Sequence, residues 1–114
     1  MQSVLLRSVA GRSLHADQLL PRLGTQATTL VWLHGLASVR RSQKSDALLR
    51  LAQKWGVGYL RVDMTGHGDS DGCLDDVSVS SWIDDVECAL QHVAESLSLS
   101  AATPPRVRLS LVAR

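Results

Sequence analysis

"YLRVDMTGHGDSDG" at residues 59–72 decides the fold of this chain, because a short apolar run passes directly into a loop rich in glycine and aspartate. A buried strand has this length and composition, and glycine is a strong local signal for its end. The segment TTLVWLHG at residues 28–35 repeats the pattern, with β-branched and aliphatic residues stopped by glycine. Both segments are therefore predicted to be interior strands of a sheet.

Segments with helical periodicity separate these strands. Residues 44–55 carry apolar side chains at helical spacing, with Ser45 as the predicted N-cap and Gly56 as the residue that ends the helix. Residues 79–98 predict a second amphipathic helix, and residues 106–113 predict a third strand. The order β-α-β-α-β predicts an α/β fold with parallel strands, crossover helices and a helical layer on both faces of the sheet.

The N-terminal residues allow two interpretations. Extended segments at residues 4–6 and 14–16 around a turn at residues 10–12 predict a β-hairpin. The same stretch has three arginines against one acid, as an organellar transit peptide can have. We prefer the hairpin and keep the transit peptide as the alternative.

The composition predicts one globular domain. The chain has 114 residues, 45% of them hydrophobic, and a net charge of +1, which gives no general case for nucleic acid as a partner. No apolar run approaches the roughly 20 residues of a membrane-spanning helix. Cys73 and Cys88 make neither a disulfide framework nor a metal pair, so we expect no metal or cofactor. The predicted location is cytoplasmic, with a mitochondrion or plastid as the alternative.

Gly68 to Gly72 satisfy G-x-S-x-G, the pattern of a nucleophile elbow, with Ser70 at its centre. An elbow requires a helix that starts directly after the serine, whereas the predicted helix starts about eight residues later. Asp69 and Asp71 flank the serine, and their charges oppose the build-up of negative charge on an oxyanion. We therefore interpret Ser70 as a residue of a polar turn and not as a nucleophile.

Two further motifs fail in the same loop. As a calcium-binding loop it has His67 at the first ligand position and Ser78 at the twelfth, where a bidentate glutamate is needed. As a dinucleotide fingerprint it has Asp71 in place of the third glycine. Neither ligand is expected here.

In their order along the chain, LVWLHGLAS, YLRVDMTGHGDSDG and WIDDVECALQHV resemble the N-terminal half of an α/β-hydrolase. The resemblance covers about residues 3–113, and the compact spacing is similar to acyl esterases and to the palmitoyl-protein thioesterase type. It implies hydrolysis of an ester, thioester or amide of a small acyl substrate. It also implies that the backbone N–H of Leu36 helps to bind the oxyanion, with His34 and Gly35 lining the site. His34 has a second interpretation, in which it only shapes the loop through backbone hydrogen bonds.

The chain departs from this family after the third predicted strand. The family's elbow follows that strand, whereas here the sequence ends at Arg114 and all four histidines precede it. We therefore expect a single partial domain over residues 1–114, without a catalytic triad and inactive alone. The alternative is a non-catalytic interaction module or a truncated isoform. Residues 106–113 would lie at a sheet edge, which favours self-association.

The remaining polar and aromatic residues are predicted to have structural roles. Asp63 is interpreted as a hydrogen-bond acceptor that anchors a turn, and His67 as an exposed loop residue. Four aspartates around the start of the second helix are expected to form a solvated face, and the three tryptophans are expected in the core. These residues are Asp75, Asp76, Asp84 and Asp85, and Trp32, Trp55 and Trp82.

Overall fold

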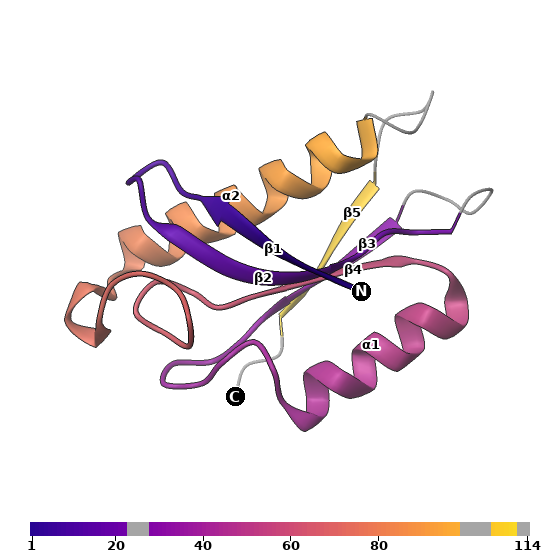
Figure 1. Ribbon diagram of the computed structural model, residues 1–114, viewed down its shortest axis with the longest axis horizontal. Coiled ribbons are helices and arrows are strands. Elements are labelled where there is room, and N and C mark those ends of the chain that lie inside the picture. The colour runs from indigo at the N-terminus through magenta and orange to yellow at the C-terminus, as the bar shows by residue number, and fades with distance from the viewer. Residues whose placement is uncertain (23–27, 99–105, 112–114) are drawn as a thin grey trace.

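The computed structural model describes residues 1–22, 28–98 and 106–111, and the elements in them follow the predicted order (Figure 1). The end of the third predicted strand, residues 112 and 113, lies outside the described residues. A short 3₁₀ turn at Leu74–Asp76 precedes the second helix. The strands are β1 (Gln2–Arg7), β2 (Ser13–Leu19), β3 (Thr28–Leu33), β4 (Gly58–Val62) and β5 (Arg106–Leu111), and the helices are α1 (Gln43–Trp55) and α2 (Val79–Ser98).

The strands form one sheet in the order β1-β2-β4-β3-β5. β3 pairs in parallel with both β4 and β5, and Val31 lies opposite Leu60 in the β3–β4 register. β1 and β2 form the predicted hairpin, and β2 joins the sheet antiparallel to β4. The sheet is therefore parallel over β4, β3 and β5 and antiparallel at the hairpin, which confirms the predicted fold class. β5 lies at one edge of the described sheet.

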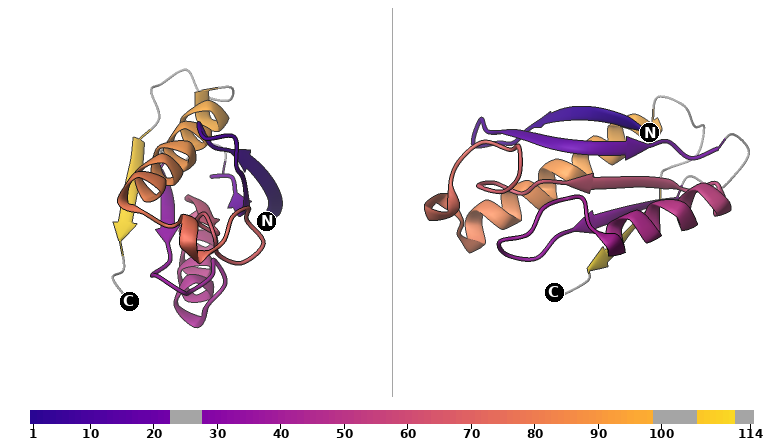
Figure 2. Two further views of the ribbon diagram at one scale, coloured as in Figure 1. Left: turned by 90° about the vertical axis from the view of Figure 1, so that its left-hand side faces the viewer. Right: turned by 60° about the horizontal axis from the view of Figure 1, so that its bottom comes forward.

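The two helices cover opposite faces of the sheet (Figure 2). Successive strand residues point to opposite faces, so β4 contributes Leu60 and Val62 to one core and Tyr59 to the other. The core under α2 is the larger one and also includes the hairpin. The core under α1 is smaller, and it contains Trp32, Tyr59, Ala52, Leu48 and Leu49.

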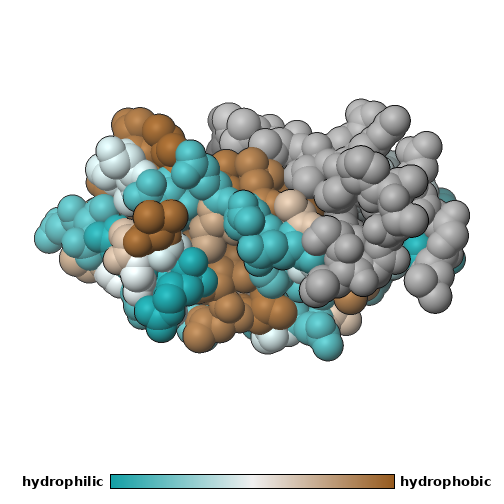
Figure 3. Space-filling view, turned by 90° about the horizontal axis from the view of Figure 1, so that it is seen from above, coloured by the Kyte–Doolittle hydropathy of each residue, from teal (hydrophilic) through white to brown (hydrophobic). Residues whose placement is uncertain are grey.

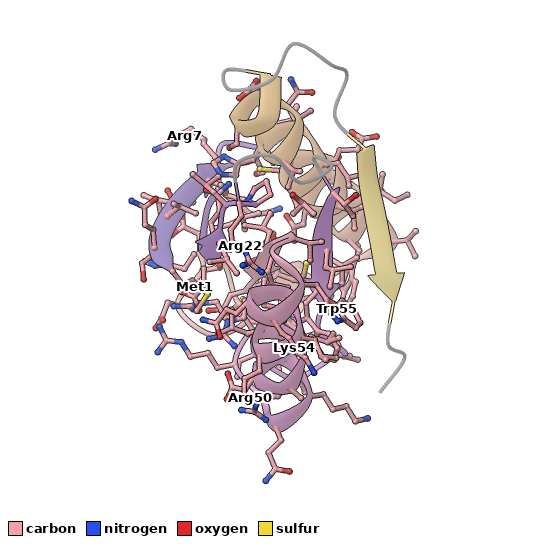
Figure 4. The ribbon with its side chains drawn as sticks, turned by 90° about the vertical axis from the view of Figure 1, so that its right-hand side faces the viewer. Met1, Arg7, Arg22, Arg50, Lys54 and Trp55 are labelled. Carbon is pink, nitrogen blue, oxygen red and sulfur yellow. The ribbon has the colours of Figure 1, made fainter. Side chains whose placement is uncertain are left out.

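The N-cap of helix α1 is Ser42 and not Ser45, which corrects the prediction. Ser42 Oγ accepts from the Ser45 N–H at 3.1 Å, and Ser45 Oγ accepts from the Ser42 N–H at 2.8 Å, so both serines form a capping box. The helix ends as predicted at Gly56, whose φ of +72° favours glycine. Arg22 lies against this end of the helix and donates to two of its carbonyl oxygens, those of Gln53 and Lys54 (Figure 4).

Trp55 is not a core residue, and the prediction for it is wrong. Its side chain is 58% exposed at the last turn of α1 (Figure 4). The face of α1 that meets the sheet is centred on Ser45, Leu48 and Ala52, so Trp55 falls at the margin of the apolar stripe. Trp32 is buried and Trp82 half-buried, as predicted.

Helix α2 begins with a second capping box. Ser78 Oγ accepts from the Ser81 N–H at 3.1 Å, and Ser81 Oγ accepts from the Ser78 N–H at 2.9 Å. Ala89 and Val93 are buried against the sheet, with Trp82 packed beside them. Neither helix in the described part of the chain is long and apolar enough to cross a membrane.

Candidate functional site

Two loops leave the sheet side by side at the carboxyl ends of β3 and β4 (Figure 1). Residues 34–41 follow β3, and residues 63–73 follow β4. Neighbouring parallel strands end at the same edge, and open α/β sheets bind their ligands outside this edge. The predicted site residues His34, Gly35 and Leu36 all lie on the first loop.

His34 shapes this loop through its backbone hydrogen bonds. The ring is buried, its Nδ1 lies 2.8 Å from the Gly35 carbonyl oxygen, and its Nε2 accepts from the Met64 N–H at 2.9 Å. Burial lowers the pKa of His34, so the ring stays neutral near pH 7. His34 thereby joins the two loops, and its role in lining a site stays a prediction.

His67 is buried, and its prediction as an exposed loop residue is wrong. Its side chain is 5% exposed and points from the second loop into the first. Nε2 accepts from the Ala37 N–H at 2.9 Å, and Nδ1 lies 2.9 Å from the Thr65 carbonyl oxygen. The rings of His67 and His34 are 4.7 Å apart, and the Trp82 ring meets both of them edge-on.

Leu36 lies at the tip of the first loop, with its side chain 68% exposed. The Ser38 N–H donates to the Gly35 carbonyl oxygen at 3.1 Å and closes a turn around it. Ala37 has a φ of +61°, a left-handed conformation that is uncommon without glycine and tends to occur at functional sites. Within residues 1–22, 28–98 and 106–111, the Leu36 N–H has no hydrogen-bond acceptor. The loop therefore holds a free donor at its tip.

Asp63 anchors both loops as a hydrogen-bond acceptor, as the sequence suggested. Its carboxylate accepts from the Arg40 N–H at 2.7 Å and from the Asp69 N–H at 2.9 Å, and it also binds the Arg40 guanidinium. Gly68 has a φ of +52°, and a Cβ at this position would overlap the Asp63 carboxylate. The loop needs glycine at residue 68 for both reasons.

A buried network of charges extends from Asp63 under the sheet towards α1. Asp17 on β2 lies 3.3 Å from Arg40 Nε and accepts from Arg61 Nε at 2.9 Å. Arg61 also binds Asp46 on α1, at 2.6 Å. Burial acts to raise the pKa of Asp17, but the hydrogen bonds from Arg61 and Arg41 lower it overall. Arg40 could not be singled out from the sequence, since nothing in the pair of arginines at 40 and 41 distinguishes the buried one from the exposed one.

Asp85 does not belong to a solvated face, which corrects the prediction for this residue. It is 1% exposed and accepts from the Thr65 N–H at 2.7 Å and from Thr65 Oγ1 at 2.9 Å. Burial raises its pKa, against the opposing effect of these two hydrogen bonds. Asp75 and Asp76 are exposed and Asp84 is half-buried. Asp85 thus ties α2 to the loop after β4.

Ser70 fastens the second loop to the strands behind it. Its Oγ donates to the Asp63 carbonyl oxygen at 2.6 Å and accepts from the His15 N–H at 2.9 Å. Asp71 adds two hydrogen bonds to Ser13 on β2. The Ser70 hydroxyl is nearly buried and fully engaged, so its geometry is that of a structural residue.

Replacing Ser70 with alanine should lower the free energy of unfolding by about 1–3 kcal/mol, because the part-buried His15 N–H loses its acceptor. Chemical denaturation measures this loss, and Ser80→Ala on the exposed surface of α2 is the matched control, with an effect within about 0.5 kcal/mol. In any longer, active form of the protein, Ser70→Ala should keep most of the activity. Near-total loss with an unchanged fold would identify Ser70 as the nucleophile.

An apolar groove of about 530 Å³ adjoins the tip of the first loop. Leu36 forms one side of it, and Val79, Trp82, Ile83 and Val86 at the start of α2 form much of the other. Seen from the side that carries α2, apolar residues lie in several patches separated by polar ones (Figure 3). The free Leu36 N–H therefore lies beside an apolar surface.

Comparison with known proteins finds relatives in sequence and neighbours in fold. No family model matches the chain. In sequence it is 30% identical over 74 residues to the mitochondrial palmitoyl-protein thioesterase ABHD10 of Bos taurus, which covers 65% of this chain and 24% of the relative. The same thioesterase of Rattus norvegicus is 31% identical over 74 residues, which cover 65% of this chain and 25% of the relative. The chain thus spans about a quarter of the length of the curated relatives it matches.

Two solved structures show the same fold. The esterase Est1E from Butyrivibrio proteoclasticus has a TM-score of 0.77 at 19% identity, over 95% of this chain and 41% of that one. The α/β-hydrolase domain-containing protein 10 from mouse has a TM-score of 0.71 at 20% identity, over 97% and 39%. This chain therefore has the fold of the N-terminal part of an α/β-hydrolase. Among curated proteins, its sequence is similar to the palmitoyl-protein thioesterase ABHD10.

Proposed function

We propose that this chain supplies the oxyanion-binding part of a serine hydrolase that acts on an ester, a thioester or an amide. The observation that carries the proposal is the free N–H of Leu36, on a loop fixed by hydrogen bonds at His34, Ala37 and Arg40. A fixed donor that points to where charge develops lowers the barrier of acyl transfer, because it needs no reorganisation during the reaction. The Gly35 carbonyl oxygen accepts the hydrogen bond that closes the turn, and His34 fixes the start of the turn.

In this reaction a serine oxygen attacks the acyl carbon, and the carbonyl oxygen becomes an oxyanion that the Leu36 N–H stabilises. The leaving group then departs, and water hydrolyses the acyl-enzyme. In these 114 residues G-x-S-x-G occurs at Gly68–Gly72 alone, and its serine is committed to structural hydrogen bonds. We therefore propose that the 114 residues alone are inactive and that the nucleophile comes from other polypeptide.

The apolar groove beside Leu36 supports an aliphatic acyl group as the substrate, and the names of the curated relatives support a thioester. The same groove also suits the alternative function, a non-catalytic interaction module, because it exposes apolar side chains of α2. Self-association along the edge of β5 belongs to this alternative. The relatives' names likewise favour the mitochondrial location over the cytoplasmic one, which imaging of a tagged chain would decide.

A fluorophosphonate probe tests whether the 114-residue chain is active on its own. We expect the 114-residue chain to stay unlabelled, since the Ser70 hydroxyl donates its hydrogen to the Asp63 carbonyl oxygen and, among the described residues, bonds to no histidine ring or carboxylate. An active serine hydrolase treated in parallel controls for the probe. Stoichiometric labelling of this chain would overturn its proposed inactivity.

The coding sequence beyond Arg114 tests the proposal directly. An in-frame G-x-S-x-G soon after β5, followed by an acid and a histidine, would supply the expected nucleophile and its partners. A transcript that ends at Arg114 and yields a soluble, cooperatively folding monomer would instead support the interaction module.

A further inference from the structure

The hydrogen-bond partners of His67 and His34 determine the protonation state of both rings. At His67, Nε2 meets the N–H of Ala37 and Nδ1 meets the carbonyl oxygen of Thr65. An N–H can only donate and a carbonyl oxygen can only accept. Nε2 must therefore be unprotonated while Nδ1 carries the hydrogen, which is the neutral Nδ1–H tautomer.

His34 is held in the same way. Its Nε2 accepts from the Met64 N–H, and its Nδ1 donates to the carbonyl oxygen of Gly35. The two rings form one tilted pair between the loops, with Trp82 against both. Each ring thus acts as a neutral bridge from one loop to the other.

We propose that His67 is a positioning residue for the oxyanion donor, and that its protonation releases the loop that carries Leu36. The catalytic meaning of this inference rests on the proposed function, whereas the loop movement does not. A second proton on His67 would place Nε2–H against the Ala37 N–H, across a distance that is now 2.9 Å. Ala37 holds a left-handed conformation next to Leu36, so loss of this hydrogen bond frees the tip of the loop.

The charged groups around the two rings are already engaged. Asp63, at the end of β4, binds Arg40 of the first loop, and Arg40 also contacts Asp69 at 3.1 Å. Asp85, on α2, is bonded to Thr65. The carboxylates of Asp63 and Asp85 favour a proton on His34, but burial outweighs them and lowers its pKa. No carboxylate hydrogen-bonds to either ring among the described residues, so neither imidazolium would gain an ionic partner.

The sign of the pH effect follows from the lowered pKa of His34. The folded chain binds a proton at this ring less readily than the unfolded chain, whose histidines titrate near 6.5. Its contribution to stability is therefore complete above that pH and is lost as the pH falls through the lowered value. Acidification weakens the junction of the two loops, and alkaline conditions leave it intact.

NMR of the isotope-labelled 114-residue chain tests the proposal without any activity measurement. At pH 8, the ring nitrogen shifts of His67 should report the Nδ1–H tautomer. On acidification, the Ala37 amide signal should move at the same pH as the His67 ring signals, and the Met64 amide should follow His34. A His67 ring with Nε2–H at pH 8, or an Ala37 amide that does not follow His67, would overturn the proposal.

Three variants separate positioning from general stability. His67→Gln offers an uncharged oxygen in place of Nε2, so the Ala37 amide should stay protected from hydrogen exchange and lose its pH response, while Met64 keeps its own. His67→Ala should speed hydrogen exchange at the Ala37 amide about tenfold.

His15→Gln, on β2, is the matched control and should leave the pH response of the Ala37 amide unchanged. An Ala37 response that persists in His67→Gln would contradict the inference. Fluorophosphonate labelling and hydrolysis assays test the proposed function. The NMR and hydrogen-exchange signals of His67 and Ala37 test this inference independently of it.

Discussion

Replacing Asp63 with alanine should lower the free energy of unfolding by about 3–5 kcal/mol, the largest effect of any single substitution considered for this chain. The variant leaves the Arg40 guanidinium buried with Asp17 as its remaining buried carboxylate. It also removes the acceptor of two backbone N–H groups, those of Arg40 and Asp69. The total free energy of unfolding of a small domain is about 5–15 kcal/mol, so this loss is a large share of the total. Urea denaturation followed by circular dichroism measures the change.

Asp69→Ala is the matched control for this prediction. Asp69 also contacts Arg40, at 3.1 Å, but its side chain is 69% exposed and water screens the pair. We expect a change within about 1 kcal/mol. Equal losses for the two variants would show that burial of the Asp63 carboxylate is not what stabilises the loops.

Replacing Leu36 with proline should reduce kcat by about 10²–10³-fold in an active hydrolase that contains these residues, because proline has no N–H to donate to the oxyanion. Hydrolysis of a short-chain thioester under saturating substrate measures this. KM should change less than kcat, since the donor acts mainly on charge that develops in the transition state.

Leu36→Ala is the control, because it shortens the exposed side chain and keeps the N–H. It should keep kcat within a few-fold of the original and raise KM for long acyl chains, which the groove would hold less well. The Ala37 amide signal shows whether the proline variant still has its loop in place. A proline variant with an intact loop and an undiminished kcat would remove Leu36 from the oxyanion site.

The sheet and its helices could be predicted because their signals are local. The apolar runs before Gly35 and before the second loop give β3 and β4, and periodic apolar residues give α1 and α2. Gly56 marks the end of α1 because the backbone there has a left-handed conformation, which glycine adopts most readily. Each of these features depends on residues within a few positions of one another, so a short window of sequence contains the information.

The polar part of the site could not be predicted in this way. His67 is buried because Ala37, thirty residues earlier, supplies its donor, and Asp85 is buried because Thr65 supplies two. Arg40 binds Asp17 on β2 and Asp63 in the loop after β4. From the sequence alone, a polar residue is predicted to be exposed when its hydrogen-bond partner is distant in the chain. Only the fold shows that the partner lies beside it.

The carboxylate of Asp63 has a consequence for protein engineering. Its oxygens bind Arg40 of the first loop and Asp69 of its own loop, so the first loop depends on the second for part of its shape. A designer who transplants residues 34–41 onto another parallel sheet would move the donor without its support. Residues 34–41 and 63–70 would therefore have to be transplanted together.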